Sequence, residues 1–242
     1  MKRLAGDLPF ALLDLAYPRA CAGCGSADVE GFNNLCWDCL AGLEWVVAPF
    51  CSVCGDPVDG LVGDAYTCST CCRDAPSFAR ARSAVRFRGA MQRALHAFKY
   101  GKIISLATDL AGLLEACVRS HYGTVRFDAA AYVPLHTHKE RERSFNQSRL
   151  LAKRLASLLE LPLFGNCLRR VRDTSTQTNL DAFARRENVR NAFEAGEAQW
   201  TEGRTLLLVD DVMTTGATID ECARTLRKAG AAAVYAVTVA RG

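Results

Sequence analysis

The stretch that decides the fold is LLLVDDVMTTGAT, residues 206–218. Its apolar residues end at two adjacent acids, Asp210 and Asp211, which predicts a buried parallel strand whose carboxyl end lies where open α/β sheets bind ligands. In the turn that follows, Gly216 permits backbone N–H groups to face an anion, and the helical pattern after the turn adds the positive end of a dipole. Carboxylates beside an anion cradle suit a phosphorylated sugar. The residues that would hold the phosphate are Thr214, Thr215, Gly216, Ala217 and Thr218.

This stretch resembles the loop that binds phosphoribosyl pyrophosphate (PRPP) in the type I phosphoribosyltransferases. The alternative is an ordinary strand, turn and helix with two solvated aspartates. Acids are common at strand ends, but the sequence Thr-Thr-Gly-x-Thr after them is not. The pattern therefore favours a PRPP site.

The composition is that of a globular protein with room for one sizeable domain and a small one. The chain has 242 residues, of which 50% are hydrophobic and 23% are charged. No apolar run approaches the ~20 residues of a membrane span, so we expect no membrane insertion. Asp7, Pro9 and Asp14 interrupt the N-terminal apolar stretch, which argues against an export signal and favours a cytoplasmic protein. Residues 4–15 instead predict a short helix that packs on the rest of the chain or on a partner.

Most of the cysteines form four Cys-x-x-Cys pairs near the N-terminus. A tight turn of this kind directs two thiolates at one ion, and two such turns complete the tetrahedral set that zinc prefers. Gly25 and Gly55 follow the second cysteine of their pairs, where a permissive backbone helps the turn to close. The pattern predicts two small zinc ribbons with one or two structural zinc ions. The ligands, paired in sequence order, would be Cys21, Cys24, Cys36 and Cys39, and then Cys51, Cys54, Cys68 and Cys71.

Disulfides are the alternative for these cysteines. The lack of an export signal argues against disulfides, and a redox Cys-x-x-Cys motif normally occurs once, beside a thioredoxin-like pattern. Cys72 could replace Cys71 as a ligand. Cys117, Cys167 and Cys222 lie in apolar segments and fit small core residues.

Positive charge is unevenly distributed, although the formal net charge is only +4. Residues 75–108 contain no acid and several arginines and lysines, and a second basic stretch runs from Lys139 to Arg154. Such stretches suit the phosphates of a small substrate or of nucleic acid. Taken one at a time, most of these residues also fit a solvated surface.

From about residue 79 the pattern alternates between strands and helices. Alternation of this kind predicts a parallel sheet covered by helices on both faces. We therefore expect residues 1–78 to form an N-terminal helix and a double zinc ribbon, and residues 79–242 to form a phosphoribosyltransferase-like α/β domain. The expected strands cover residues 84–87, 127–133, 163–168, 205–209 and 233–240, and the expected helices cover 89–100, 103–121, 145–160 and 218–229.

Four cysteine pairs ahead of such a domain make nearly the whole chain resemble the ComF family of competence proteins. The matching segments are FKYGK (98–102), VPLH (133–136) with RERSFNQS (141–148), and LRR (168–170) with Gln177 and Arg185. Ser144 stands where the family usually has glycine. If that glycine has a positive φ or touches ligand, the serine would reshape the loop.

The resemblance implies a role for each part of the site. Asp210 and Asp211 would hold the ribose hydroxyls, and the 214–218 turn would hold the 5′-phosphate. The backbone at Leu135 and His136 would bind the pyrophosphate, with Mg²⁺ bridging pyrophosphate and ribose oxygens largely through water.

The same resemblance places further candidates around the ligand. Gln177 and Arg185 lie in a polar segment where related transferases have a mobile lid, and Arg170 lies just before it. The other candidates from the matching motifs are Lys99, Tyr100, Arg141, Arg143, Asn146 and Gln147.

Three functions fit these observations. The chain is a phosphoribosyltransferase whose acceptor the sequence does not identify, or a module that binds PRPP without turnover, or a protein that handles incoming single-stranded DNA during natural competence. The third function is compatible with either of the others, although an aromatic content of 8% limits base stacking. The expected partners are PRPP, single-stranded DNA, a competence helicase and other DNA-uptake proteins.

Overall fold

The computed structural model describes residues 20–242 apart from residues 28, 30–33, 61–62, 64 and 174–181. The helix expected over residues 4–15 and the candidate Gln177 lie outside the described residues. None of the described helices combines the length and the apolar character that a membrane crossing requires. In chain order the elements are α2 (Trp37–Ala41), α3 (Ser69–Arg73), β1 (Arg80–Arg86), α4 (Gly89–Tyr100), α5 (Leu106–Tyr122), β2 (Ala129–Tyr132), α6 (Thr137–Arg143), α7 (Gln147–Leu158), β3 (Leu168–Arg170), α8 (Ala182–Val189), β4 (Phe193–Ala195), the short 3₁₀ turn η2 (Ala198–Trp200), β5 (Thr205–Met213), α9 (Ala217–Lys228) and β6 (Ala233–Arg241).

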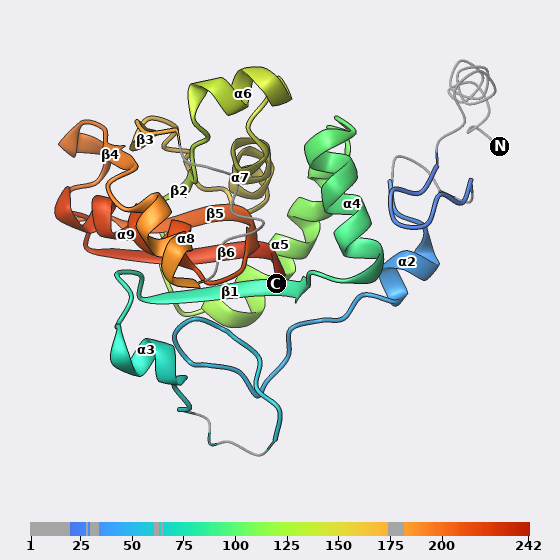
Figure 1. Ribbon diagram of the computed structural model, residues 1–242, viewed down its shortest axis with the longest axis horizontal. Helices are drawn as coiled ribbons and strands as arrows, with labels where there is room; N and C mark the ends of the chain where they lie inside the picture. The colour runs from blue at the N-terminus through green and yellow to red at the C-terminus, as the bar shows by residue number, and fades with distance from the viewer. Residues whose placement is uncertain (1–19, 28, 30–33, 61–62, 64, 174–181) are drawn as a thin grey trace.

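Four parallel strands form the central sheet, in the order β1-β6-β5-β2 (Figure 1). A parallel bridge between Ala130 and Leu163 extends the β2 edge. Because the strands all run the same way, their carboxyl ends meet at one edge of the sheet, and the loops after β1, β5 and β2 gather there. The predicted parallel sheet is confirmed.

Helices cover both faces of this sheet, and alternate residues of β5 show how. Leu207 and Val209 pack in a core with α4, α5 and α7, whereas Leu206 and Leu208 pack in a second core with α9 on the opposite face. All four residues are fully buried. A strand that is buried on both faces needs a continuous apolar run, which explains why this strand was visible in the sequence.

The two cysteine-rich units pack on opposite faces of the sheet. The buried cysteines of the first unit belong to the core with α4 and α5, and those of the second unit belong to the core with α9. Between the units, Trp45 forms an antiparallel bridge with Val85, and the Val46 N–H donates to the Ala84 carbonyl. The connecting chain therefore covers the outer edge of β1, an edge that would otherwise offer unpaired backbone groups.

A buried arginine fastens the second unit to the sheet. Arg82, on β1, donates from its guanidinium to the carbonyls of Ser52 (2.9 Å) and Ala81 (2.7 Å). The same guanidinium lies 4.7 Å above the ring centre of Phe50. The N-terminal region is thus built directly onto the α/β region, and the expected division at residues 78 and 79 stays a prediction.

One expectation about secondary structure was wrong, and one helix was not predicted. The single strand expected over residues 163–168 is two features, because Leu163 bridges to the central sheet while β3 pairs antiparallel with β4 in a separate sheet. Gly165 and Asn166 interrupt the apolar run between them. Helix α6 was not expected, since its sequence THKERER has no apolar periodicity and none of its residues is buried.

Candidate functional site

The two predicted acids lie near the carboxyl end of β5, and each has a partner from another element. The Asp211 Oδ2 is 2.8 Å from the Nζ of Lys99, which comes from α4. The Asp210 Oδ1 accepts hydrogen bonds from the Ser148 hydroxyl, in the first turn of α7, at 2.7 Å and from the backbone N–H of Asp211 at 2.9 Å. Three elements that are distant in the sequence therefore meet at the acid pair.

Asp210 ionises less readily than an ordinary carboxylic acid. Burial raises the pKa of Asp210 to about 7, and the charge of the neighbouring Asp211 adds to this effect. The hydrogen bond from Ser148 and the charge of Lys99 act in the opposite direction but do not compensate. The site thus combines a carboxylate paired with Lys99 and a second acid that ionises near neutral pH.

The turn after β5 has the geometry of an anion cradle. Gly216 has φ +80° and lies at the N-cap of α9, and a Cβ at this position would be 2.6 Å from the Met213 Cε. The left-handed backbone therefore favours glycine here. A hollow of about 30 Å³ is bordered by Asp210 and residues 212–219, at the helix end whose first N–H groups have no intrahelical acceptors.

A cavity of about 410 Å³ includes the acid pair and shares Thr214 and Thr218 with the hollow. Its lining contains five basic residues and only these two acids, so it favours an anionic ligand. Leu135 and Gln147 also line it. The predicted residues that meet in this cavity are Lys99, Tyr100, Leu135, Arg143, Gln147, Arg170, Arg185, Asp210, Asp211, Thr214 and Thr218.

Of these two spaces, Thr215, Gly216 and Ala217 border only the hollow, and three further predicted residues line neither the hollow nor the cavity. Asn146 is buried and caps α7, because its side-chain oxygen accepts from the backbone N–H of Arg149 at 3.1 Å. His136 caps α6, where its Nδ1 accepts from the backbone N–H of His138 at 3.4 Å. Arg141 is exposed on α6. The first two hold the loops beside the cavity, and the third lies on the surface.

Six residues of the cavity are not among the predicted site residues: Phe87, His96, Val133, Lys139, Ser148 and Val212. Ser148 had a usable signal, since it follows the N-cap Asn146 at the start of a helix. Lys139 belongs to α6, whose sequence gave no periodic pattern. Phe87 and His96 reach the cavity because the end of β1 and helix α4 lie near the acids of β5, which are far away in the sequence.

Ser144 has the unusual backbone that its family position implies. It ends α6 with φ +70°, in the left-handed region, and its hydroxyl accepts from the Nζ of Lys102 at 3.1 Å. Lys102 also has a positive φ, of 55°. Two non-glycine residues in this strained conformation thus meet beside the cavity.

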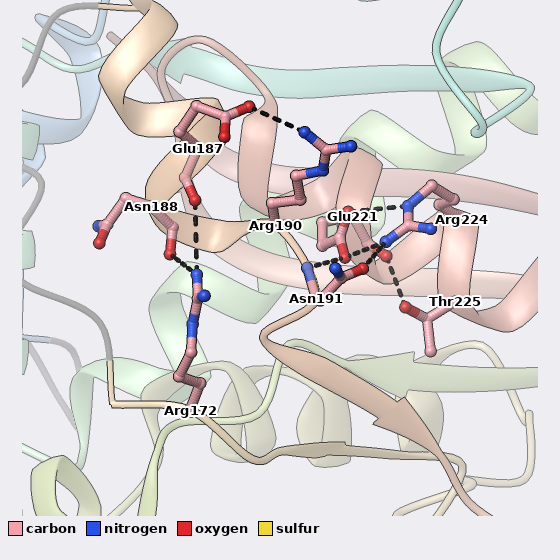
Figure 2. Close-up of polar contacts among 8 residues, drawn as sticks. All are labelled: Arg172, Glu187, Asn188, Arg190, Asn191, Glu221, Arg224 and Thr225. Atoms are coloured by element: carbon pink, nitrogen blue, oxygen red, sulfur yellow. Dashed lines mark hydrogen bonds and ion pairs between the residues drawn. The ribbon is translucent and has the colours of Figure 1, made fainter.

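Helix α8, which brings Arg185 to the cavity, is fastened to α9 by a polar network (Figure 2). The buried Glu221 of α9 accepts from the Asn191 backbone N–H at 2.7 Å and from the Arg224 Nε at 2.9 Å. Arg172 donates to the Asn188 carbonyl at 2.9 Å, near the last turn of α8. Because α9 also begins at the anion cradle, this network fixes Arg185 relative to it.

The cysteines form two tetrads that fit zinc. In each set the sulfur atoms all lie within 4.8 Å of one another. Two sulfur–sulfur separations are 3.6 Å (Cys24 to Cys36) and 3.8 Å (Cys54 to Cys68), close to the edge of about 3.8 Å of a tetrahedron with Zn–S distances of ~2.3 Å. The members are Cys21, Cys24, Cys36 and Cys39 in the first set, and Cys51, Cys54, Cys68 and Cys71 in the second.

The structure separates Cys71 from Cys72. Cys71 is buried in the second tetrad, whereas Cys72 is exposed and directs its thiol at the Thr67 carbonyl, 3.6 Å away. The backbone also favours a thiolate at Cys21. Burial acts to raise the pKa of this thiol, but hydrogen bonds from the backbone N–H groups of Cys36, Cys24 and Gly23 lower the pKa to about 6. Zinc binding requires that deprotonated form.

The basic stretch of residues 75–108 does not form one continuous surface. Arg82 is buried under the second cysteine unit, and Lys99 is paired with Asp211. Arg93 is exposed but donates to the Gly23 carbonyl, in the first unit. Arg80 and Arg88 are exposed. The basic residues of this stretch therefore have different surroundings, because the cysteine units cover some of them and leave others exposed.

Two family models match the chain. One is a double zinc ribbon domain, over residues 12–74, and the other is a phosphoribosyl transferase domain, over residues 146–242. With the observed sheet and cysteine tetrads, these matches confirm the predicted fold class: a phosphoribosyltransferase-type parallel sheet with helices on both faces, preceded by a double zinc ribbon. They also support structural zinc at the tetrads.

Three relatives match over most of the chain. Competence protein F of Haemophilus influenzae is 31% identical over 213 residues, which cover 86% of this chain and 91% of the relative. DNA utilization protein YhgH of Escherichia coli is 32% identical over 215 residues, covering 83% and 94%. Competence protein ComFC of Bacillus subtilis is 27% identical over 215 residues, covering 86% and 85%.

Proposed function

Because the chain belongs to the ComF family of competence proteins, we propose that it binds PRPP with Mg²⁺ at the β5–α9 site and acts in the utilisation of incoming DNA. The observation that supports binding most strongly is the sequence of groups along one cavity. Asp210 and Asp211 are followed directly by the anion cradle of residues 214–218, and basic residues line the remaining wall. This arrangement matches the order of groups in PRPP: a 5′-phosphate, ribose hydroxyls and a pyrophosphate.

Each part of PRPP has a matching set of protein groups. The backbone N–H groups of residues 214–218 and the dipole of α9 bind the 5′-phosphate. Asp210 and Asp211 accept hydrogen bonds from the vicinal ribose hydroxyls. The backbone at Leu135 and His136, after β2, binds the pyrophosphate. Arg143 and Lys139 from α6 add positive charge to the cavity that receives it.

The residues also fit magnesium. Among the described residues, the clusters of three or more potential ligands are the two cysteine tetrads, so no preformed carboxylate cage for Mg²⁺ is present there. Magnesium commonly uses one or two carboxylates together with substrate phosphates and water. The ion would therefore enter with the pyrophosphate, neutralise its charge, and use Asp210 or Asp211 from the protein.

The proposed DNA role rests on the relatives, which are named as competence and DNA utilization proteins. We assign single-stranded DNA as the macromolecular partner, because exposed arginines such as Arg88 follow β1 at the same edge of the sheet as the cavity. Binding through such residues is sequence-independent and weakens as the salt concentration rises.

Calorimetric titration of PRPP tests the small-molecule part. Wild type should bind PRPP with Mg²⁺ and lose most of the affinity without it. Thr215→Val removes a cradle hydroxyl and should weaken binding about tenfold, as the loss of ~1.4 kcal/mol of hydrogen bonding predicts. Thr225→Val is the matched control on α9, since that hydroxyl bonds only to the Glu221 carbonyl of its own helix. Wild type that fails to bind PRPP with Mg²⁺ present would contradict the proposal.

A pyrophosphate-release assay then separates the two forms of this function. Release in the presence of an acceptor assigns a transferase, and tight binding without release assigns a module that holds PRPP. The assay is run with nucleobases and with single-stranded DNA as acceptors.

Single-strand binding is tested by its salt dependence. Arg86→Glu with Arg88→Glu should weaken binding and reduce the log–log salt slope by about 0.7 for each lost phosphate contact. Arg119→Glu with Arg126→Glu is the control, because Arg126 precedes β2 and lies toward the opposite end of the parallel strands. Equal losses in both pairs would contradict a defined DNA surface at the site edge.

A further inference from the structure

A second cavity, of about 460 Å³, lies between the second cysteine unit and the anion cradle. Residues 214–217 of the cradle line it, and the cysteine unit contributes three members of its tetrad, Cys54, Cys68 and Cys71. Among the described residues, this cavity shares only Arg185 and Thr214 with the substrate cavity, and the acid pair is not part of it. The metal ligands of the second unit and the turn that would hold a phosphate thus border the same space.

Two polar contacts join the chain after this tetrad to α8 and α9. Asp74, which follows α3, lies 2.8 Å from the Nη1 of Arg186 on α8. The backbone N–H of Ser77 donates to the Oδ1 of Asp220, in the first turn of α9, at 2.6 Å. Since α9 begins at the cradle and α8 brings Arg185 to the substrate cavity, both contacts reach elements that would touch the ligand.

The last strand gives a third contact, through a buried cation. The side chain of Arg241 is only 6% exposed, and its Nε donates to the Oδ1 of Asp56, two residues after Cys54, at 3.0 Å. The described residues offer no hydrogen-bond acceptor to its Nη1. The next residue, Gly242, donates from its backbone N–H to the carbonyl of Met213, immediately before the cradle, at 3.0 Å. The end of β6 therefore contacts both the second unit and the start of the cradle.

Zinc would change the charge that Arg241 meets. Four thiolates around one Zn²⁺ carry a net negative charge, which the unbound thiols lack. A buried cation is stable only when opposite charge or hydrogen-bond acceptors lie near it. Arg241 lines the second cavity together with three of these cysteines. Metal at the second tetrad therefore favours the observed position of Arg241, and with it the arrangement at the start of the cradle.

The first cysteine unit is attached at other places. The backbone N–H of Asn34 donates to the Oδ2 of Asp109 on α5 at 2.8 Å, and the Gly23 carbonyl accepts from Arg93 on α4. None of the described residues of this unit lines the hollow, the substrate cavity or the second cavity. The two units therefore differ in their contacts with the site.

We propose that the second zinc ribbon positions the anion cradle, so that PRPP binding depends on the metal at the second tetrad and not on the metal at the first. This inference rests on the proposed function and adds a metal dependence to it. Asp74, Ser77 and Arg241 are positioning residues, since they act through α8, α9 and the residues before the cradle. Because coupling between two binding sites is reciprocal, bound PRPP should also tighten zinc at the second tetrad by the same factor.

A matched pair of cysteine variants tests the difference. Cys71→Ser and Cys39→Ser each remove one ligand from one tetrad, and both residues are 8% exposed in a helix of five residues. In calorimetry with Mg²⁺, Cys71→Ser should weaken PRPP binding at least about fivefold, the lower end of typical coupling between sites. Cys39→Ser should change it by no more than about twofold. Equal losses in the two variants would overturn the proposal.

Zinc affinity is a second readout, and it does not depend on turnover. Each variant keeps one complete tetrad, whose zinc is titrated against a chelator at equilibrium with and without PRPP and Mg²⁺. PRPP should tighten the zinc of the Cys39→Ser protein, which keeps the second tetrad, at least about fivefold. The zinc of the Cys71→Ser protein should not change. The same shift in both proteins, or no shift in either, would contradict the coupling.

Asp74→Asn tests one contact without changing a metal ligand. It removes the charge that pairs with Arg186 and should weaken PRPP binding about twofold, because partly exposed ion pairs contribute little. Asp38→Asn is the control, since Asp38 is an exposed acid beside a ligand of the first tetrad. Both proteins should keep their zinc. An Asp74→Asn protein that binds PRPP as tightly as the Asp38→Asn protein would contradict positioning through α8.

Amide hydrogen exchange without ligand separates this inference from the proposed function. Residues 214–220 should exchange faster in Cys71→Ser than in Cys39→Ser, with folding verified by circular dichroism. If a cysteine variant does not fold, the same comparison is made between Asp74→Asn and Asp38→Asn. If wild type fails to bind PRPP but this difference is seen, the proposed function falls and the positioning stands. If PRPP binds to wild type but the paired variants match in exchange and in affinity, the positioning falls and the proposed function stands.

Discussion

The zinc ribbon region is shaped by residues that lie close together in the sequence, whereas the site of the α/β region is formed by residues that lie far apart in it. In the ribbon region the helices α2 and α3 have five residues each, and cysteines four residues or fewer apart set the shape. In the α/β region, the partners of one acid pair come from Lys99, Ser148 and Asp211 itself. A metal centre of this type is therefore readable from local spacing, whereas a substrate cavity depends on which strand ends become neighbours.

The largest expected effect concerns what holds the ribbon region together. Chelation of zinc should unfold the ribbons and leave most of the α/β helices intact, because structural zinc contributes ~10–16 kcal/mol of apparent binding free energy in small zinc domains. Amide hydrogen exchange with and without chelator would show protection lost over the ribbon residues and retained over β5 and β6. Equal loss of amide protection in both regions would contradict the view that zinc holds only the ribbon region together.

The zinc content of two cysteine variants tests which residues bind the metal. Cys71→Ser should lower the bound zinc from two ions per chain to one, whereas Cys72→Ser should leave both, since only Cys71 lies in a tetrad. Equal zinc content in the two variants would contradict the assignment, and wild type with four disulfides and no metal would refute zinc altogether.

The next effect concerns the contact between the regions. Arg82→Met should lower the free energy of unfolding by about 3 kcal/mol, because it leaves the Ser52 carbonyl unpaired and removes a charged hydrogen bond. Arg80→Met, an exposed change on the same strand, should cost under about 0.5 kcal/mol. Chemical denaturation measures both, and equal costs would show that the ribbon does not depend on Arg82.

A smaller expected effect is the pH dependence of PRPP binding in the substrate cavity. Since the pKa of Asp210 is raised to about 7, its ionised form is scarce at pH 6 and dominant at pH 8. The affinity for PRPP should therefore rise about tenfold more over this range in wild type than in Asp210→Asn, which removes the titration while the phosphates still titrate. Equal pH profiles would show that Asp210 ionisation is not needed.

The raised pKa of Asp210 also makes the free energy of unfolding depend on pH. A raised pKa means that the folded state keeps a proton that the unfolded state has lost, so this contribution to the free energy of unfolding is full below pH 3.8 and is lost as the pH rises through about 7. Asp210→Asn should remove that loss. Denaturation curves at pH 5 and pH 8 compare the two proteins.

The smallest expected effect concerns Ser144. Ser144→Gly should stabilise the protein by about 1 kcal/mol, the cost of a left-handed backbone at a residue with a Cβ. Ser157→Gly, in the exposed face of α7, should do the opposite by a similar amount. Thermal denaturation measures both, and destabilisation by Ser144→Gly would show that its contact with Lys102 outweighs the strain.

Much of this molecule could be predicted from the sequence, for identifiable reasons. The run Leu206 to Val209 marked a doubly buried strand, and Gly216 marked a turn with a left-handed backbone that favours glycine. Gly25 and Gly55, predicted to ease the cysteine turns, both have positive φ. In each case the information lies within a few residues.

The remaining features depend on contacts that no local pattern reveals. Helix α6 is polar throughout, so periodicity did not indicate it, and Lys139 was missed with it. Arg82 and Arg88 were both assigned to a basic stretch, but the second cysteine unit covers Arg82 on β1, while Arg88 lies beyond the end of that strand and is exposed. Phe87 and His96 join the cavity because the fold brings the end of β1 and helix α4 near the distant acids of β5.

The most direct test of the central claim is the affinity of Asp211→Asn for PRPP. Asp211 lies near the end of β5, its side chain pairs with Lys99, and the change to asparagine keeps its size. Hydrogen bonds to charged groups contribute roughly 1.5–3 kcal/mol each, so PRPP should bind about ten- to a hundredfold more weakly. Asp59→Asn, an exposed change in the ribbon region, should bind as wild type does. Equal PRPP affinity in all three proteins, with Mg²⁺ present and folding verified, would contradict a phosphosugar site at this acid pair.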